Sequence, residues 1–172
     1  HSAYTQCFTM ISNLAPVAQS ETLAFLGRMA ESNSKFCTRE NPAFITITRL
    51  LRSLAYEERH FYDCASMLYR FALSERPSEK NNSVLDVLSS LFPVHLSGTH
   101  ATPEQRISFI RERIENPRRD ITLKLIERML QTNRFVSHIG FDFGSRVRDY
   151  GYSPESYNEY ERWFLDILKL TD

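Results

Sequence analysis

Apolar side chains recur along most of the chain at intervals of three and four residues, a spacing that places them on one face of an α-helix. The pattern predicts eight helices, and the first two lie around residues 8–14 and 23–29. The other six apolar stripes run over residues 44–54, 61–72, 84–92, 107–114, 121–130 and 160–168. Only residues 44–48 alternate as a strand does, and the stripe that continues to Leu54 favours a helix there.

Four of the seven prolines follow a residue type that caps helix N-termini well. Asn, Thr and Ser side chains accept a hydrogen bond from the first free N–H groups, and proline fits the first helical position. The four pairs are Asn41-Pro42, Thr102-Pro103, Asn116-Pro117 and Ser153-Pro154. We expect helices to begin at these sites. Gln105 completes a capping box with Thr102, and the last pair predicts a C-terminal helix over residues 154–170.

These elements indicate an all-α fold of about eight helices in antiparallel hairpins. Residues 41–76 and 102–132 each have the size of one helix pair in an α-solenoid, although the pairs share no repeated motif. A solenoid-like array and a compact helical domain both remain open. The length of 172 residues suits one domain over residues 1–172. Because the chain begins with His1 rather than Met, we expect it to be a piece of a larger protein.

Residues 133–152 break the helical pattern and form an aromatic- and glycine-rich loop before the C-terminal helix. Three of the five glycines lie here, and long ordered loops are often functional. Tyr and Arg are favoured at the energetic centres of protein interfaces. We therefore select five candidate partner-binding residues, which are Asp142, Arg146, Arg148, Tyr150 and Tyr152. In the alternative interpretation the rings cap the helical array, and Arg146 or Arg148 pairs with Asp142 or Asp149.

The charge is balanced, with 21 basic and 21 acidic side chains. A general nucleic-acid or membrane-surface binder usually carries a basic excess, so we expect neither partner. No apolar run approaches the ~18 residues of a membrane span. Arginine outnumbers lysine by 17 to 4, and arginine suits ion pairs and protein interfaces. A phosphate- or RNA-binding patch is the alternative, built from Arg118, Arg119, Arg146 and Arg148.

Several short motifs suggest chemistry but lack the partners that the chemistry needs. Asp142-Phe143-Gly144 matches the magnesium-binding tripeptide of protein kinases, but the other kinase motifs are missing. We therefore interpret it as a structural turn. A small enzyme using the 138–148 loop is the alternative, with Asp142, His138 and Arg146 converging on one point.

His60 and Cys64 share a helix face near Asp63, but zinc would need further ligands. The remaining histidines considered, His95, His100 and His138, have no paired spacing. We expect no metal, no cofactor and no enzymatic activity. The odd count of three cysteines at wide spacing favours a reducing cytoplasm.

Three segments resemble a helical region of large bacterial proteins similar to STAND-type signalling NTPases and antiviral defence proteins. They are Leu51-Arg52-Ser53-Leu54-Ala55-Tyr56, Leu88-Ser89-Ser90-Leu91-Phe92 and Ala101-Thr102-Pro103-Glu104-Gln105-Arg106-Ile107. The resemblance covers about residues 50–130. The family has tryptophan in place of Tyr56 and His95, and a glycine-rich turn near residues 78–80 that this chain lacks.

The matching positions are core and turn positions, so the resemblance carries over no catalytic residue. It implies a helical, sensor-type region of a multidomain protein, in which any NTP binds a neighbouring domain. We therefore expect a non-catalytic protein-recognition or scaffold region of a bacterial signalling or defence protein. Its partner would be another protein or a neighbouring domain of the same chain.

Overall fold

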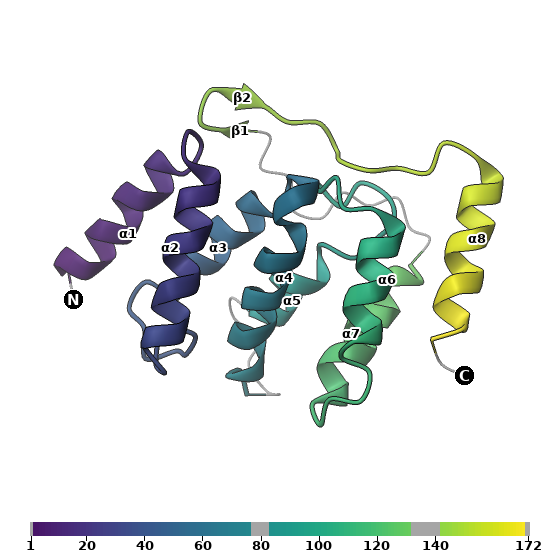
Figure 1. The fold of residues 1–172 in the computed structure, drawn as a ribbon, viewed down its shortest axis with the longest axis horizontal. Helices are drawn as coiled ribbons and strands as arrows, with labels where there is room; N and C mark the ends of the chain where they lie inside the picture. Colours follow the sequence, from purple (N-terminus) through teal and green to yellow (C-terminus); the bar gives the residue numbers. More distant parts are fainter. Residues whose placement is uncertain (1, 77–82, 132–141, 171–172) are drawn as a thin grey trace.

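The computed structural model describes residues 2–76, 83–131 and 142–170, and this part is mostly helical (Figure 1). Its helices are α1 Ser2–Leu14, α2 Gln19–Ser32, α3 Phe44–Leu54, α4 Glu58–Leu73, α5 Val84–Ser89, α6 Pro103–Arg111, α7 Arg119–Met129 and α8 Tyr157–Leu168. The predicted all-α fold is confirmed. The prediction missed one small element, a hairpin of β1 Asp142–Phe143 and β2 Arg146–Val147.

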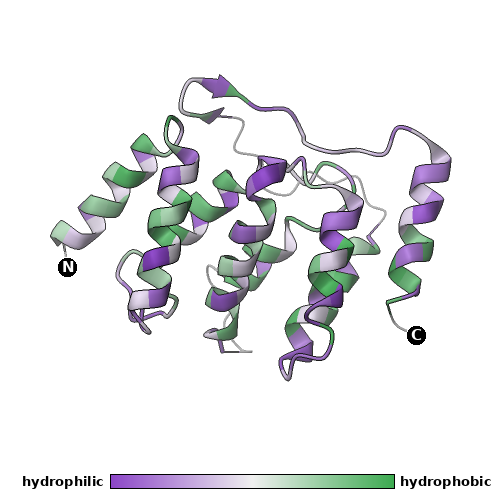
Figure 2. Cartoon of the chain, viewed as in Figure 1, coloured by the Kyte–Doolittle hydropathy of each residue, from purple (hydrophilic) through white to green (hydrophobic). Residues whose placement is uncertain are grey.

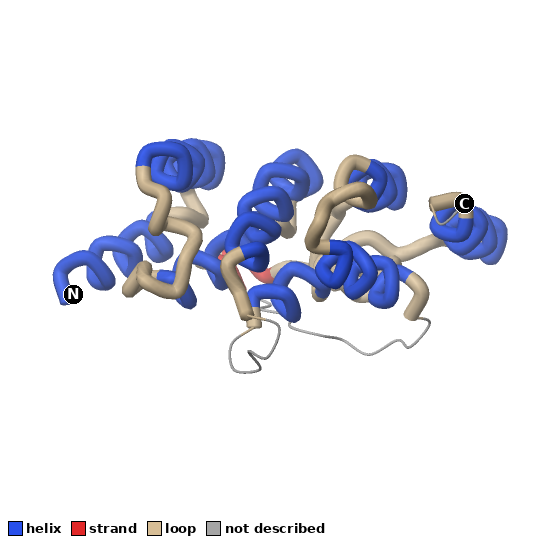
Figure 3. Tube along the Cα trace, turned by 90° about the horizontal axis from the view of Figure 1, so that it is seen from below, coloured by secondary structure: helices blue, strands red, loops and turns tan. Residues whose placement is uncertain are grey.

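The helices stand side by side in two layers (Figures 1 and 3). The odd-numbered helices form one layer, in which α3 packs on α1 and α5, and α5 packs on α7. The even-numbered helices form the other, in which α2 packs on α4 and α6 on α8. Each helix alternates apolar and polar residues around its surface (Figure 2). The apolar stripes therefore meet between the layers, as the helical periodicity predicts.

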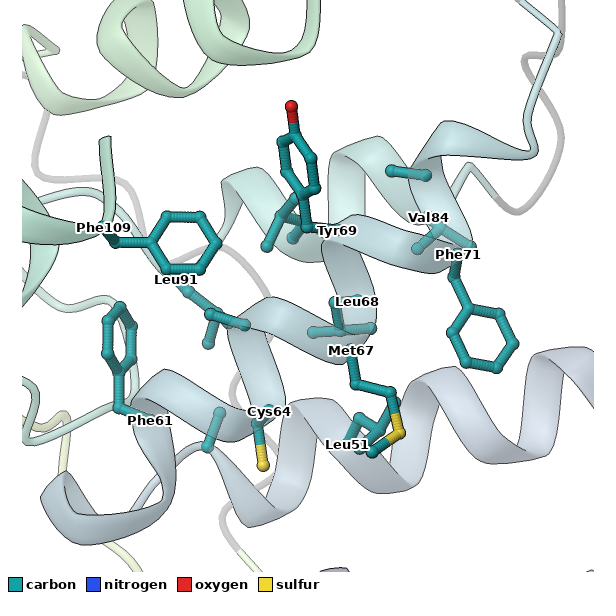
Figure 4. Close-up of a cluster of buried hydrophobic side chains, with 14 of the residues drawn as sticks. Leu51, Phe61, Cys64, Met67, Leu68, Tyr69, Phe71, Val84, Leu91 and Phe109 are labelled. Atoms are coloured by element: carbon teal, nitrogen blue, oxygen red, sulfur yellow. The ribbon is translucent and has the colours of Figure 1, made fainter. Parts of the chain in front are cut away.

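Helix α4 lies at the centre of the array and supplies much of the core (Figure 4). Its Phe61, Cys64, Leu68 and Phe71 are completely buried. Ring contacts extend this core to the neighbouring elements, as in the edge-to-face pair of Phe61 with Phe92 at 5.9 Å between centroids. Aromatic pairs in this geometry contribute beyond the area that they bury.

One of the four predicted helix starts is confirmed in detail. The Thr102 hydroxyl accepts from the Gln105 N–H at 3.2 Å, and the Gln105 side chain accepts from the Thr102 N–H at 3.0 Å. This is the complete capping box, and α6 begins at Pro103. Both orphan donors at this helix end are thereby satisfied.

The other three predicted starts are two or three residues too early. Helix α3 begins at Phe44, because the Asn41 side chain accepts from the Ala43 N–H and holds a turn before the helix. Asn116 does the same through the Arg118 N–H, ahead of α7. Short polar side chains favour such turns over helix in the next two residues.

At the last site, Ser156 is the N-cap and accepts from the Glu159 N–H at 3.3 Å. Helix α8 therefore spans Tyr157–Leu168 rather than residues 154–170. Ser153 instead lies 2.6 Å from Nδ1 of His95.

The C-terminal ends of six consecutive helices are hydrogen-bonded in the same way. In each, a backbone carbonyl in the last turn, or just beyond it, accepts a hydrogen bond from a side chain outside the helix. The pairs are Arg70–Ala30 at 2.8 Å, Arg148–Ser53 at 2.7 Å, Arg118–Leu73 at 3.1 Å, Arg106–Leu91 at 3.0 Å, Arg113–Phe109 at 3.0 Å and Trp163–Met129 at 2.9 Å. Carbonyls at a helix C-terminus lack the N–H of a continuing helix and carry the negative end of its dipole. The Ser53 carbonyl also accepts from the Tyr56 N–H at 3.4 Å.

Arg106 is an arginine whose hydrogen-bond partners are a helix-end carbonyl and a hydroxyl instead of a carboxylate. Its side chain is completely buried, and it donates to the Leu91 carbonyl and, at 2.8 Å, to the Ser97 hydroxyl. Burial lowers the pKa of its guanidinium to about 9. Arg52 donates to the Ser90 hydroxyl and to the Ser97 and Gly98 carbonyls. Both arginines thus hold the turn of residues 97–99 through oxygen atoms that carry no formal charge.

A substitution at Trp163 tests how much one hydrogen bond to a helix-end carbonyl contributes to the stability of the fold. Replacing Trp163 by Phe removes the indole N–H that Met129 uses while keeping a large aromatic ring. We expect the free energy of unfolding to fall by about 1–3 kcal/mol, because a buried carbonyl loses its partner and some packing is lost. Urea denaturation measures the change. The matched control Tyr157→Phe alters an 82% exposed ring of the same helix and should stay within about 0.5 kcal/mol. Equal losses in both variants would contradict the role of the indole N–H.

Candidate functional site

The segment of residues 142–153, called the strap below, crosses one end of the helix array. It runs from the turn between α1 and α2 to the start of α8 (Figure 1). The β1–β2 hairpin forms its first part, with Asp142 opposite Val147 and Phe143 opposite Arg146. A Cβ placed on Gly144 would lie 2.7 Å from Cβ of Pro16, so this end of the strap touches the α1–α2 turn.

The Asp142-Phe143-Gly144 tripeptide forms the hairpin and its turn. Gly144 has a φ of +67°, which glycine adopts without steric cost. A two-residue turn with glycine at its first position suits the twist of a β-hairpin. The interpretation of this tripeptide as a structural turn therefore agrees with the geometry of the backbone.

Arg148 anchors the middle of the strap. Its side chain is buried and donates to the Ser53 carbonyl at the end of α3. The guanidinium also stacks on the rings of Tyr56 and Phe143, at 4.4 and 4.3 Å from their centroids. Desolvation lowers the pKa of Arg148, although Tyr56 and Glu57 oppose this shift.

The expectation that Arg148 contributes to an exposed binding surface is therefore wrong. The Ser53 carbonyl and two aromatic rings occupy its guanidinium, which faces the helix array rather than solvent. Hydrogen bonding to a helix C-terminus and stacking on rings compensate its charge without a carboxylate. The predicted ion pair between an arginine of this segment and Asp142 or Asp149 is thus replaced, at Arg148, by a carbonyl and two rings.

Next to this anchor, Tyr56, His100 and Asp149 form a polar cluster. The Tyr56 hydroxyl donates to Oδ1 of Asp149 at 3.0 Å, and Nε2 of His100 lies 3.0 Å from the same oxygen. Burial alone would raise the pKa of Asp149. Hydrogen bonds from the Gly151 N–H and the Tyr56 hydroxyl, together with His100, outweigh it and hold this pKa below its usual value.

Backbone hydrogen bonds complete the attachment of the strap. The Gly98 N–H donates to the Tyr150 carbonyl at 3.0 Å, and the Tyr152 N–H donates to the Thr99 carbonyl at 2.9 Å. Gly151 has a φ of +78°, and a Cβ there would lie 2.4 Å from the Thr99 carbonyl oxygen. Only glycine allows the two backbones to approach this closely.

The outer face of the strap contains three of the four remaining candidate residues, and the fourth, Tyr152, packs against the core. Asp142 and Arg146 are exposed, and the Tyr150 side chain is 45% exposed. Tyr152 is half-buried and lies 5.9 Å from the guanidinium of Arg106. Sequence reasoning missed Val147, which is 84% exposed. Its place opposite Asp142 in a hairpin was the signal, but the hairpin was not predicted.

The arginines of the alternative phosphate- or RNA-binding patch do not come together. The loop that leads into α7, which contains Arg118, lies at the opposite end of the helices from the strap (Figure 1). Both nitrogens of the Arg118 fork lie 2.9 Å from the Asp120 carboxylate. This hydrogen bonding raises the pKa of Arg118 and lowers that of Asp120.

The zinc hypothesis for His60, Asp63 and Cys64 receives no geometric support. Cys64 points into the core, and burial raises the pKa of its thiol, whereas Asp63 is exposed. Within residues 2–76, 83–131 and 142–170, no three histidine, cysteine or acidic side chains cluster as metal ligands do. His138, which the enzyme alternative requires, lies outside the described residues.

Among the helices that the structure describes, none has both the length and the apolar character to cross a membrane. Models of known protein families, curated proteins and solved structures give no match to this chain.

Arg148→Ala tests the anchor of the strap. The variant loses the bond to Ser53 and two ring contacts, so we expect the free energy of unfolding to fall by about 2–3 kcal/mol. Hydrogen exchange of the Gly98 and Tyr152 amides should accelerate by about tenfold or more. Arg146→Ala, two residues away but exposed, is the control and should change stability by less than about 0.5 kcal/mol. Unchanged amide protection in Arg148→Ala would contradict the anchoring role.

The Asp149 cluster predicts a dependence on pH with a definite sign. Because folding lowers the pKa of Asp149 from 3.8, its ionised form adds stability that is fully present above about pH 4 and is lost as pH falls through the folded pKa. Asp149→Asn should therefore destabilise the protein at about pH 6 and destabilise it less near pH 3. Urea unfolding at both pH values measures this difference.

Asp142→Asn serves as the control for this titration, since Asp142 accepts none of those three hydrogen bonds. A difference between wild type and Asp149→Asn that is the same at both pH values would contradict the prediction.

Proposed function

We propose that this chain is a protein-recognition region whose binding surface is the outer face of the strap. The observation that carries the proposal is the pairing of exposed interface-type side chains with a firmly held backbone. Arg146, Val147 and Tyr150 face solvent, and the backbone between them is held by Arg148 and by the 98–99 turn. The residues that dominate interface energies are enriched in tyrosine and arginine, the types of Tyr150 and Arg146.

The attachment of the strap supports this proposal energetically. A free loop pays an entropic cost when a partner orders it, whereas a backbone that is already fixed does not. Hydrogen bonds to Ser53, Thr99 and Gly98 hold the strap over the helix ends before any partner arrives. The exposed valine and tyrosine can then contribute their full burial to the complex.

The chemistry of this face indicates the kind of partner surface that would bind it. Val147 and Tyr150 offer apolar contact, and Arg146 offers a cation with a planar fork. A shallow apolar hollow with a carboxylate at its edge would match these three groups. The acids Asp142 and Asp149 lie on the same segment and would disfavour a polyanion, since like charges repel.

The strap also offers a route by which binding could affect the rest of a larger protein. It touches the α1–α2 turn at Gly144 and leads directly into α8. Displacement of the strap would thus change contacts at both sides of the array, which is the kind of element that switches use. We assign this recognition role to a sensor or scaffold region of a bacterial signalling or defence protein, acting in the cytoplasm. A stacked, solenoid-like helix array fits the same role.

The test uses a photo-activatable residue at Val147 in the full-length protein, expressed in its own cells. We expect one discrete cross-linked species at this position. Additional Arg146→Ala and Tyr150→Ala substitutions should reduce its yield by about tenfold, because they remove two of the three contacts. Mass spectrometry of the adduct identifies the partner or the neighbouring domain.

Leu123 provides the matched control, because its side chain is 62% exposed on α7. The same probe at Leu123 should give no discrete adduct. Equal adducts at Leu123 and Val147, or an adduct insensitive to the Arg146 and Tyr150 substitutions, would overturn the proposed surface.

A further inference from the structure

A small pocket between α2 and α4 lies outside the strap and plays no part in the function proposed above. Its volume is about 240 Å³, and it is lined by Ser20, Leu23, Ala24, His60, Asp63 and Met67. The first three residues share a face of α2, and the last three share a face of α4, at the spacing of one and two helical turns. Two packed helices thus present six side chains to one space.

His60 is the unusual member of this lining. Its side chain is 6% exposed, and Nε2 has no hydrogen-bond partner among the described residues. A buried polar atom without a partner is costly, and native structures rarely retain one without a reason. Burial, followed by the nearby charge of Arg59, lowers the pKa of His60, against the opposing effects of Glu57 and Asp63. This lowered pKa favours the neutral imidazole, which has one nitrogen able to accept a hydrogen bond.

Asp63 lies one helical turn after His60 and is exposed, so it places a carboxylate at the mouth of the pocket. Ser20 faces it from α2 and adds a hydroxyl. The wall contributed by Leu23, Ala24 and Met67 is apolar. The pocket therefore combines a ring nitrogen, a carboxylate and a hydroxyl with a hydrocarbon surface, and it lacks a cationic side chain among its lining residues.

Water can hydrogen-bond to these three polar groups, but it gains nothing from the apolar wall. An ammonium group fits better. It can donate one N–H to Nε2 of His60, place its charge beside Asp63, and bury a hydrocarbon body against Leu23 and Met67. At ~30 Å³ for each water-sized atom, the volume admits about eight non-hydrogen atoms.

We propose that the α2–α4 pocket binds a small primary ammonium compound with a compact hydrocarbon body of about seven carbons. His60 accepts from the ammonium group, Asp63 compensates its charge, and the Met67 and Leu23 side chains contact the hydrocarbon. This assignment is independent of the strap, so either proposal can fail without the other.

The test uses benzylamine, which has the required charge and size, against its neutral analogue benzyl alcohol. Both are titrated into the full chain labelled at its methionine methyl groups, of which the sequence supplies four. We expect benzylamine to shift the Met67 signal and to bind about tenfold more tightly than benzyl alcohol, since only the cation pairs with Asp63. Met129, which is fully buried and does not line the pocket, should not shift.

Two variants then separate the contributions of the two acceptors. Asp63→Asn should remove the preference for the cation and leave the folded state intact, because Asp63 is exposed. His60→Gln, which keeps a side-chain acceptor, should retain more affinity than His60→Leu. Glu127→Gln removes one negative charge from α7 and is the control for net charge.

Three outcomes would overturn the proposal. They are the absence of a Met67 shift at about 10 mM benzylamine, equal affinity for benzylamine and benzyl alcohol, and an equal loss of affinity in Asp63→Asn and Glu127→Gln. The wild-type titration needs no substitution, so a variant that fails to fold does not affect the first two outcomes.

Discussion

The fold depends on how its helices end. An α-helix leaves its last carbonyl groups without partners, and packing several helices side by side brings many of these groups out of water. In this chain the guanidinium groups of five arginines and the indole of Trp163 supply the missing donors for α2 to α7. A guanidinium offers five donors in one plane and keeps its charge when buried. Five of the 17 arginines thus bond to helix-end carbonyls.

This constraint shapes the loops as well as the helices. Arg52 and Arg106 both bond to Ser97, one through its carbonyl and the other through its hydroxyl. The turn of residues 97–99 that they hold provides the backbone groups that form hydrogen bonds with the strap. Leu96 takes a φ of +50° just before this turn, a conformation that side chains with a Cβ rarely adopt. The polar groups at one end of the array thus form a connected set, and the candidate binding surface rests on it.

The helices could be predicted from the sequence because apolar periodicity is a local signal. Most residues of the apolar stripes are buried or half-buried, although Leu14, Leu130 and Leu168 at the ends of three stripes are exposed. The capping box at Thr102 was equally local. Asn41 and Asn116 were ambiguous, since the same side chain can cap a helix or hold the turn before it. Arg148 could not be placed, because nothing in its neighbourhood reveals that its acceptor is Ser53, 95 residues earlier in the chain. The α2–α4 pocket could not be predicted for the same reason, since three of its lining residues come from α2 and three from α4.

The position of the strap also imposes an order on folding. Its contacts reach back to Pro16 near the start of the chain and to Ser53 and Tyr56 in the middle. During synthesis, helices α1 to α7 emerge and can pack through contacts between near neighbours, which form quickly. The helix-end carbonyl of Ser53 and the backbone of residues 98–99 acquire their strap partners only when this later segment has been translated. Until the strap emerges, the carbonyl of Ser53 and the backbone of residues 98–99 at this end of the nascent array lack the partners that the strap supplies.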